Sequence, residues 1–275
     1  MGQSTVRNFP AGGGPPAFLD LPPRSSKPRA TGLTHVLDMG RPAADLGDLL
    51  QTAAAHIDIW KFGFGTAYID PAISDKVALL DRHAVTACIG GTLLEVSWMQ
   101  DRVEECLQWA ADVGFPVVEV SNGAVLMPPE DKRRLIKRAA ADFVVVSEVG
   151  SKDADAPVDA AAWRDEMLGD LAAGAKLTLA EGRASGTVGL YRPDGSVRAD
   201  LVELLVTSVG LDRVIFEAPR ATQQAWFIRT LGNEVSLGNV NDSAVIGLEA
   251  LRLGLRADTL DSTNVAAQRW SGDGQ

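Results

Sequence analysis

Residues 33–40 read LTHVLDMG, an apolar run that ends in an acid, a methionine and a glycine. The first five of these residues are typical of a buried β-strand. A carboxylate is costly to bury without a partner, so the position of Asp38 at the end of this run needs an explanation. Seven further runs of similar character follow along the chain. Their number and spacing indicate the fold.

The eight strand candidates alternate with longer helical patterns. Among the helical stretches, PPEDKRRLIKRAAA begins with proline, ATQQAWFIRTLG ends in glycine, and SAVIGLEALRLG has apolar residues at helical spacing. Eight strand–helix units in 275 residues predict a single-domain (β/α)8 TIM barrel. An open doubly wound sheet has the same alternation, but the count of eight and the absence of GxGxxG after the first strand favour the barrel. The strand candidates are residues 33–40, 57–63, 84–91, 116–123, 143–150, 176–183, 213–219 and 234–240.

The two ends of the chain lack this alternation. Residues 1–30 are rich in glycine, proline and serine and predict a flexible N-terminal arm, whereas residues 261–275 form a polar C-terminal tail. Residues 31–260 are then the catalytic barrel. The chain has no apolar segment of signal-peptide type and no apolar run of the roughly 18 residues that a membrane span needs. We therefore expect neither export nor a membrane partner.

Charge and cysteine content narrow the function further. The chain has 26 basic and 36 acidic residues, a formal net charge of −10, which argues against a nucleic-acid partner. Cys88 and Cys106 lie in apolar contexts without metal-ligand spacing, so we expect reduced thiols and a cytoplasmic protein. His35, His56 and His83 do not gather at strand ends, which argues against a zinc site.

Polar residues recur at the C-terminal ends of the predicted strands. In a (β/α)8 barrel this face carries the active site, so the pattern predicts an enzyme. A single polar strand end is as easily a rim salt bridge, but this explanation does not suit so many strands at once. Converging carboxylates need positive charge, which basic side chains or Mg²⁺ would supply. The residues are Asp38, Lys61, Glu119, Glu148, Glu181, Arg183, Glu217 and Asn239.

The end of the eighth strand candidate suggests a phosphate site. Residues 237–240 read LGNV, and a helix begins near Ser243. Phosphate sites near the seventh and eighth strands are common in barrels. Gly238 and Asn239 are therefore candidate substrate-binding residues. Gln223, at the start of the helix after the seventh strand, is a third candidate.

Several longer strings occur in a set order along the chain: GLTHVLDMG, KFGFGT, GGTLLE, VEVSNG, SEVGSK, EGRASG, FEAPRATQQ and LEALRLGLRADT. Together they resemble the phosphosulfolactate synthase family over residues 31–260. The resemblance implies a (β/α)8 barrel that adds sulfite to phosphoenolpyruvate with the help of Mg²⁺. It also implies small-molecule partners, namely phosphoenolpyruvate and sulfite or a thiol, and assembly into a homo-oligomer.

The resemblance also implies roles for individual residues. Lys152, in the SEVGSK string, matches the general acid that protonates C2 of the substrate. Lys61 and Arg183 match basic positions suited to phosphate or sulfite. The carboxylates expected around Mg²⁺ are Glu148, Glu181, Glu217 and Asp38, with Glu119 as a further candidate.

Three residues depart from the family pattern and leave alternatives open. Met39, Asn122 and Ala184 stand where the family usually has lysine, aspartate and glutamate. The changes are either neutral or mark a pocket adapted to a different nucleophile or acceptor. A Schiff-base aldolase with Lys61 or Lys152 is a second alternative. A non-catalytic, stress-associated relative is a third, against which the retained basic and acidic strand ends argue.

Overall fold

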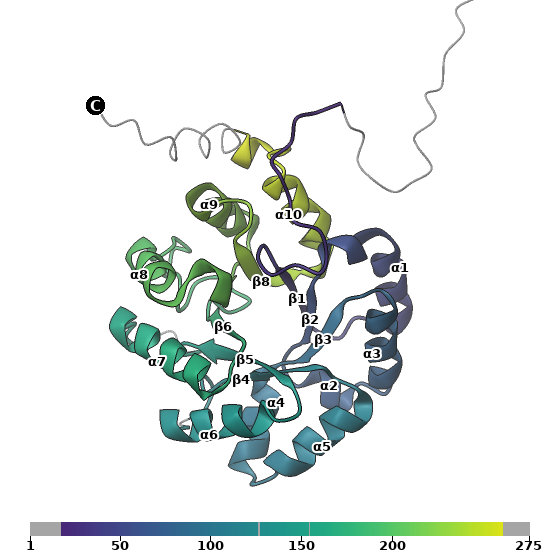
Figure 1. The fold of residues 1–275 in the computed structure, drawn as a ribbon, viewed down its shortest axis with the longest axis vertical. Coiled ribbons are helices and arrows are strands. Elements are labelled where there is room, and N and C mark those ends of the chain that lie inside the picture. The colour runs from purple at the N-terminus through teal and green to yellow at the C-terminus, as the bar shows by residue number, and fades with distance from the viewer. Residues whose placement is uncertain (1–17, 126, 154, 261–275) are drawn as a thin grey trace, which may run out of the picture.

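The computed structural model describes residues 18–125, 127–153 and 155–260, and in it eight strands form a central ring with helices outside (Figure 1). All neighbouring strands are parallel, and β8 pairs with β1, so the sheet closes. The predicted (β/α)8 barrel is confirmed. The strands are β1 (Thr34–Asp38), β2 (Ile59–Phe62), β3 (Thr86–Ile89), β4 (Val117–Val120), β5 (Val144–Val149), β6 (Leu177–Ala180), β7 (Val214–Glu217) and β8 (Ser236–Asn241).

The helices follow the strands, with two in each of the second and third units instead of the one expected. Helix ends carry the usual signals: Asp159 caps the start of α7, and Gly114 ends α5 at a φ of 93°. No helix within the described residues is long and apolar enough to cross a membrane. The α-helices are α1 (Ala43–Ala53), α2 (Thr66–Ile69), α3 (Ile73–Arg82), α4 (Gly91–Met99), α5 (Val103–Val113), α6 (Pro129–Ala139), α7 (Ala160–Ala173), α8 (Ala199–Val209), α9 (Ala221–Leu231) and α10 (Val245–Arg252).

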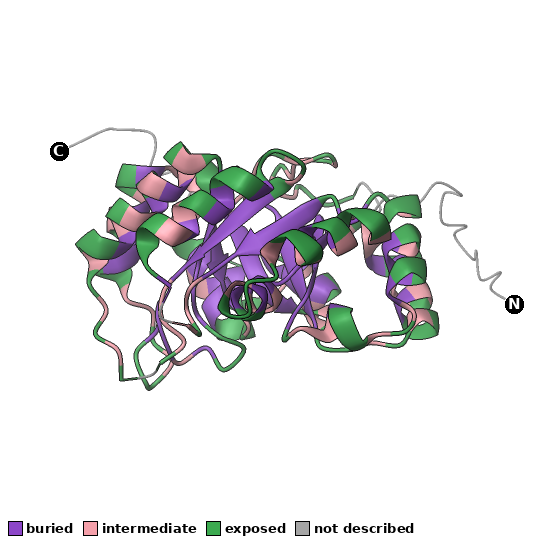
Figure 2. Cartoon of the chain, turned by 90° about the horizontal axis from the view of Figure 1, so that it is seen from below, coloured by how far each residue is buried: buried purple, intermediate pink, exposed green. Residues whose placement is uncertain are grey.

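Strand side chains alternate between two apolar layers, and Figure 2 shows the strands buried behind the exposed outer helices. Outward residues such as Val36, Trp60 and Phe216 pack against the helices. Both cysteines carry free thiols; Cys88 is buried and Cys106, on α5, is half-buried. The inward residues that fill the lower barrel are Leu33, Ile59, Cys88, Val117, Val146, Leu179 and Ile215.

The described part of the predicted N-terminal arm is bonded to the barrel. Arg29 forms an ion pair with Asp58 at 3.0 Å, just before β2. Lys27 donates hydrogen bonds to carbonyl oxygens before the same strand, and Arg24 pairs with Glu234 before β8. Residues 24–29 therefore lie at the N-terminal ends of the strands. Residues 1–17 and the predicted tail 261–275 lie outside the described residues.

A buried ion cluster behind β5 connects the barrel wall to α6 and α7. Lys132, fully buried on α6, donates to the carbonyl oxygen of Glu148 at 2.7 Å. Its ammonium also lies 2.6 Å from Glu166 and 2.9 Å from Asp170, both on α7. Asp170 in turn accepts a hydrogen bond from Ser147 of β5. The cluster holds in place the strand that carries Glu148.

Lys132→Met is expected to lower the free energy of unfolding by about 3–5 kcal/mol, because it removes the close cation of the fully buried Asp170. Arg102→Ala, which removes an exposed ion pair with Glu105, is the control and should cost less than about 1 kcal/mol. Urea denaturation measures both. Equal, small losses for the two variants would contradict a stabilising role for the cluster.

Candidate active site

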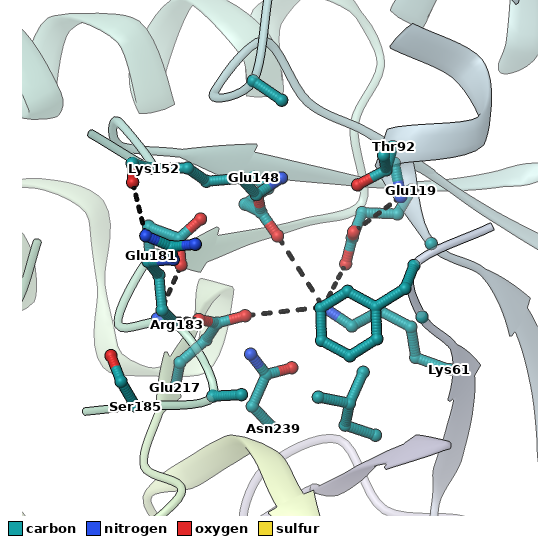
Figure 3. A pocket seen from close by; sticks show the side chains of 17 residues that line it. Lys61, Thr92, Glu119, Glu148, Lys152, Glu181, Arg183, Ser185, Glu217 and Asn239 are labelled. Atoms are coloured by element: carbon teal, nitrogen blue, oxygen red, sulfur yellow. Dashed lines mark hydrogen bonds and ion pairs between the residues drawn. The ribbon is translucent and has the colours of Figure 1, made fainter. Parts of the chain in front are cut away.

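One pocket of about 510 Å³ opens at the C-terminal ends of the strands (Figure 3). This is the face on which the sequence predicted the active site. The pocket combines four carboxylates with three cations, so its charges nearly balance. Its polar and charged lining residues are Lys61, Thr92, Glu119, Glu148, Lys152, Glu181, Arg183, Ser185, Glu217 and Asn239.

The carboxylates reach the pocket because of strand alternation. Each lies two positions after a residue of the apolar barrel interior, and residues two apart on a strand face the same side. The same holds for the lysine of β2. Charged side chains therefore form a layer directly above an apolar floor. The successive residues are Ile59 and Lys61, Val117 and Glu119, Val146 and Glu148, Leu179 and Glu181, and Ile215 and Glu217.

Asn239 enters the pocket through a bulge in β8. Thr34 of β1 pairs with Leu237 and Val36 pairs with Val240, so β8 has one residue more than β1 over this stretch. Such a bulge re-aims a side chain, and Asn239 itself has a φ of +49°. Its side chain lines the pocket, is 7% exposed, and its Oδ1 has no hydrogen-bond partner among the described residues.

Lys61 lies at the centre of the carboxylate layer, as Figure 3 shows. Its Nζ is 3.0 Å from Oε2 of Glu119, 3.4 Å from Oε1 of Glu217 and 3.7 Å from Oε2 of Glu148. Burial alone would lower the pKa of Lys61, but these three carboxylates raise it well above its ordinary value. The ammonium is therefore charged and serves as the counter-ion of three strands.

The carboxylates differ in their affinity for protons. Burial raises the pKa of Glu119 to about 7 despite the opposing effect of Lys61. Burial, with Glu217 and Glu148 nearby, raises the pKa of Glu181 well above its ordinary value. Burial would also raise the pKa of Glu148, but Lys152 and Lys61 outweigh it and lower that pKa. The layer thus contains both a firmly ionised glutamate and glutamates that hold protons readily.

Lys152 lies at the edge of the pocket in the loop between β5 and α7. Its Nζ is 2.9 Å from Oε1 of Glu148 and 3.5 Å from Oε1 of Glu95, and its side chain is 25% exposed. Burial would lower the pKa of Lys152, but Glu148, Glu181 and Glu95 raise it. The sequence did not identify Glu95 as a site residue. The only signal was an acid inside the otherwise apolar start of a helix, GTLLEV.

Arg183 follows β6 in a left-handed conformation with a φ of +55°. Its backbone N–H donates to Oε1 of Glu181 at 2.6 Å and to Oε2 of Glu217 at 2.9 Å. One guanidinium nitrogen donates to the carbonyl oxygen of Lys152 at 2.8 Å. The backbone of Arg183 thus fixes two carboxylates, while its exposed guanidinium remains at the mouth of the pocket.

Asp38 does not join the cluster that the sequence predicted for it. Its carboxylate accepts hydrogen bonds from the indole N–H of Trp60 at 3.1 Å and from the backbone N–H groups of Gly40 and Arg41. Its neighbour Leu37 lines the pocket, so by strand alternation Asp38 faces the helices. Asp38 is therefore a structural residue of the turn after β1 and not a candidate metal ligand.

Gln223 and Gly238 also lie outside the pocket lining. The buried Gln223 amide donates to the carbonyl oxygens of Gly186 and Gly195, so it holds the loop after β6 in place. A Cβ on Gly238 would lie 3.0 Å from Ile215 and 3.2 Å from His35. Gly238 thus faces the barrel interior beneath the pocket, where a side chain has no room.

Of the three departures from the family pattern, only Ala184 lines the pocket. Met39 is 57% exposed and borders a separate hollow beside Arg41. The side-chain amide of Asn122 donates to the carbonyl oxygen of Met127 at 3.4 Å. Ala184 is therefore the one departure that changes the pocket lining directly.

The pocket suits a magnesium ion that is shared with a substrate. Within the described residues, no three acidic, histidine or cysteine side chains surround a common metal position. Mg²⁺ commonly takes only one or two carboxylates, with water and substrate oxygens as its other ligands. Oε2 of Glu181 is buried without a hydrogen-bond partner among the described residues, and Glu148 and Glu217 are its neighbours. This donor chemistry fits such an ion.

Comparison with known proteins identifies relatives along almost the whole chain. The family model described as (2R)-phospho-3-sulfolactate synthase (ComA) matches residues 22–258. Phosphosulfolactate synthase of Methanothermobacter thermautotrophicus is 40% identical over 258 residues, which cover 89% of this chain and 97% of that protein. Phosphosulfolactate synthase of Bacillus subtilis is 38% identical, with 88% and 97% covered.

Solved structures share the fold. 3-Hexulose-6-phosphate synthase from Salmonella typhimurium superimposes with a TM-score of 0.51 at 14% sequence identity, covering 86% of this chain and 99% of that chain. At this identity the likeness extends to the barrel alone.

Glu119→Gln is expected to flatten the pH dependence of stability between about pH 4.5 and 7. The pKa of Glu119 is raised from 4.5 to about 7 in the folded protein, so the folded state holds this proton more tightly. Its contribution to stability is complete below the unfolded pKa and is lost as the pH rises through the folded pKa. Urea denaturation at the two ends of this range measures the difference. The exposed Glu203→Gln is the control, and an unchanged pH dependence in Glu119→Gln would argue against the raised pKa.

Proposed function

The chain belongs to the (2R)-phospho-3-sulfolactate synthase family of enzymes, and we propose that it adds sulfite to phosphoenolpyruvate. The sulfur lone pair would form a bond to C3, the electrons of the double bond would move to C2 and the carboxylate, and a proton would then be added to C2. The product is 2-phospho-3-sulfolactate. The observation that carries this proposal is the arrangement of Lys152, Arg183 and the glutamate layer in one pocket at the barrel mouth.

Both proposed substrates are anions, so the positions of the cations decide how they bind. Lys61 is occupied by three buried carboxylates and supports the floor of the pocket. Arg183 is exposed at the mouth, and a guanidinium binds oxyanions such as phosphate or sulfite through two parallel N–H groups. We assign anion binding to Arg183, with Asn239 and Ser185 as polar neighbours in the same lining.

Lys152 is the proposed proton donor to C2. Its ammonium is at the pocket edge, close to the ionised Glu148, and is accessible enough to regain a proton from water. A positioned general acid typically contributes about 10²–10⁴-fold to a rate. The neighbouring carboxylate keeps the ammonium charged until the carbon accepts the proton.

Magnesium completes the proposal. Bound to the substrate carboxylate, it would stabilise the negative charge that develops there as a Lewis acid. Glu181 would hold it, with Glu217 or Glu148 as a second ligand, because these side chains adjoin each other in the pocket. The proposal thus includes Mg²⁺ as the cofactor. It also includes a cytoplasmic location and assembly into a homo-oligomer.

The alternatives considered from sequence differ in what they require. A Schiff-base lysine must be neutral to attack a carbonyl, whereas carboxylates raise the pKa of both Lys61 and Lys152. Addition of a thiol in place of sulfite keeps the same acceptor, and Ala184 is the departure from the family pattern that lines the pocket where a different nucleophile would bind. Thiol addition is therefore the variant closest to the main proposal. Borohydride trapping with a keto acid would detect an aldolase.

Incubation with phosphoenolpyruvate, Mg²⁺ and either sulfite or a panel of thiols is expected to yield the sulfite adduct, detected by mass spectrometry.

Lys152→Ala should lower turnover by about 10²–10⁴-fold, because it removes the proposed proton donor. The circular dichroism spectrum should stay unchanged, because the barrel remains folded.

Lys137→Ala, an exposed lysine on α6, is the matched control and should keep full turnover. Near-wild-type turnover of Lys152→Ala would remove Lys152 from the proposed role. If a thiol adduct formed and the sulfite adduct did not, the nucleophile would be a thiol and not sulfite.

Glu181→Gln is expected to weaken Mg²⁺ binding by about tenfold or more in the presence of phosphoenolpyruvate, because an amide replaces a carboxyl group that would release its proton and bind the ion as a carboxylate. Isothermal titration calorimetry measures the affinity without any need for turnover. Glu203→Gln serves again as the exposed control. Equal affinity in Glu181→Gln and the unmodified protein would exclude Glu181 as a ligand.

A further inference from the structure

Glu95 is a fully buried acid on α4 that does not line the pocket. Burying a carboxylate is costly unless its oxygens have hydrogen-bonding or charged partners. The contacts of Glu95 therefore indicate what this residue does.

The two oxygens of Glu95 connect three segments. Oε1 accepts a hydrogen bond from the hydroxyl of Ser121, just after β4, and lies 3.5 Å from the ammonium of Lys152. Oε2 accepts a hydrogen bond from the backbone N–H of Ala124 at 2.9 Å. One carboxylate thus holds α4 to the loop after β4 and to the loop after β5.

The backbone beside this contact is tightly packed. The N–H of Lys152 donates to the carbonyl oxygen of Gly123 at 3.1 Å. A Cβ at Gly123 would lie 2.7 Å from the carbonyl oxygen of Gly150 and 3.4 Å from Cγ of Lys152. The loop after β4 therefore fixes the backbone of Lys152, while Glu95 fixes the far end of its side chain.

The two pocket lysines differ in the number of carboxylates around them. Three glutamates surround the ammonium of Lys61, and two of them, Glu119 and Glu217, accept hydrogen bonds from it. Within the described residues, the ammonium of Lys152 has ion-pair contacts with only Glu148 and Glu95, and Lys152 lines the pocket with a side chain that is 25% exposed.

We propose that Glu95 is a positioning residue that, together with Glu148, holds the Lys152 ammonium in place so that it faces the substrate. This inference rests on the proposed role of Lys152 as proton donor. It explains why an acid is buried outside the pocket, and why Lys152 and not Lys61 is available for proton transfer.

The test is Glu95→Gln, which keeps the side-chain shape and still accepts a hydrogen bond from Ala124 but places an amide in front of Lys152. We expect kcat to fall by about 10–100-fold, with KM for phosphoenolpyruvate changed less than about threefold, because misplacement of a reacting group by about 1 Å costs about 10²-fold. Acetylation of Lys152 by acetic anhydride, followed by peptide mass spectrometry, should become several-fold faster.

Glu249→Gln is the matched control. It likewise replaces a buried helix glutamate that pairs with a basic side chain, Arg24, but at the opposite end of the barrel from the pocket. We expect it to leave both kcat and the acetylation rate of Lys152 unchanged. If the two variants change these quantities equally, Glu95 has only a structural role.

A double-mutant comparison separates positioning from independent effects. In a Lys152→Ala background, Glu95→Gln should lower kcat no further and should recover part of the thermal stability lost with Lys152. Additive losses of kcat, or an unchanged acetylation rate in Glu95→Gln, would overturn the proposal. Acetylation and stability need no turnover, so these readouts judge Glu95 even if sulfite addition is not observed.

Discussion

The ion pairs of Lys61 with Glu119, Glu148 and Glu217 are the constraint on which the rest of this site depends. Several carboxylates at one end of a closed barrel repel each other and are poorly solvated, so an internal cation is needed to keep them there. The single ammonium on β2 reaches β4, β5 and β7 across the barrel mouth. It therefore connects strands that are far apart in the sequence and forms part of the pocket floor.

Glu148 belongs to both charged groups of the pocket. One of its oxygens faces Lys61 in the floor, and the other forms an ion pair with Lys152 at the edge. Behind the same strand, Lys132 binds the backbone of Glu148 and the acids of α7. The buried cluster outside the barrel and the polar layer inside it thus meet at β5. The same strand therefore contributes both to the stability of the fold and to the proposed site.

The rim of the pocket contains backbone strain of the kind found at functional sites. Arg183 and Asn239 line the pocket with φ values of +55° and +49°, a region that non-glycine residues adopt at a cost. In Arg183 this geometry directs the backbone N–H to two glutamates. In Asn239 it leaves a buried amide oxygen without a partner among the described residues. A bound cation or hydrogen-bond donor would satisfy this oxygen.

The sequence by itself determined the barrel, its eight strands and the face that carries the charges, because alternation and strand count are local properties of the chain. It also placed Lys61, Glu119, Glu148, Glu181 and Glu217, each two residues beyond an inward apolar residue, and it indicated Lys152, Arg183 and Asn239 as candidates. Tertiary structure alone decided how the side chains reach the pocket and which candidates stay outside it. The extra residue in β8 turned Asn239 into the pocket above Gly238, and pairing with Trp60 kept Asp38 outside it. Glu95 reaches Lys152 only because α4 packs against two neighbouring loops. Register, bulges and contacts between loops depend on neighbours distant in sequence, so no local pattern encodes them.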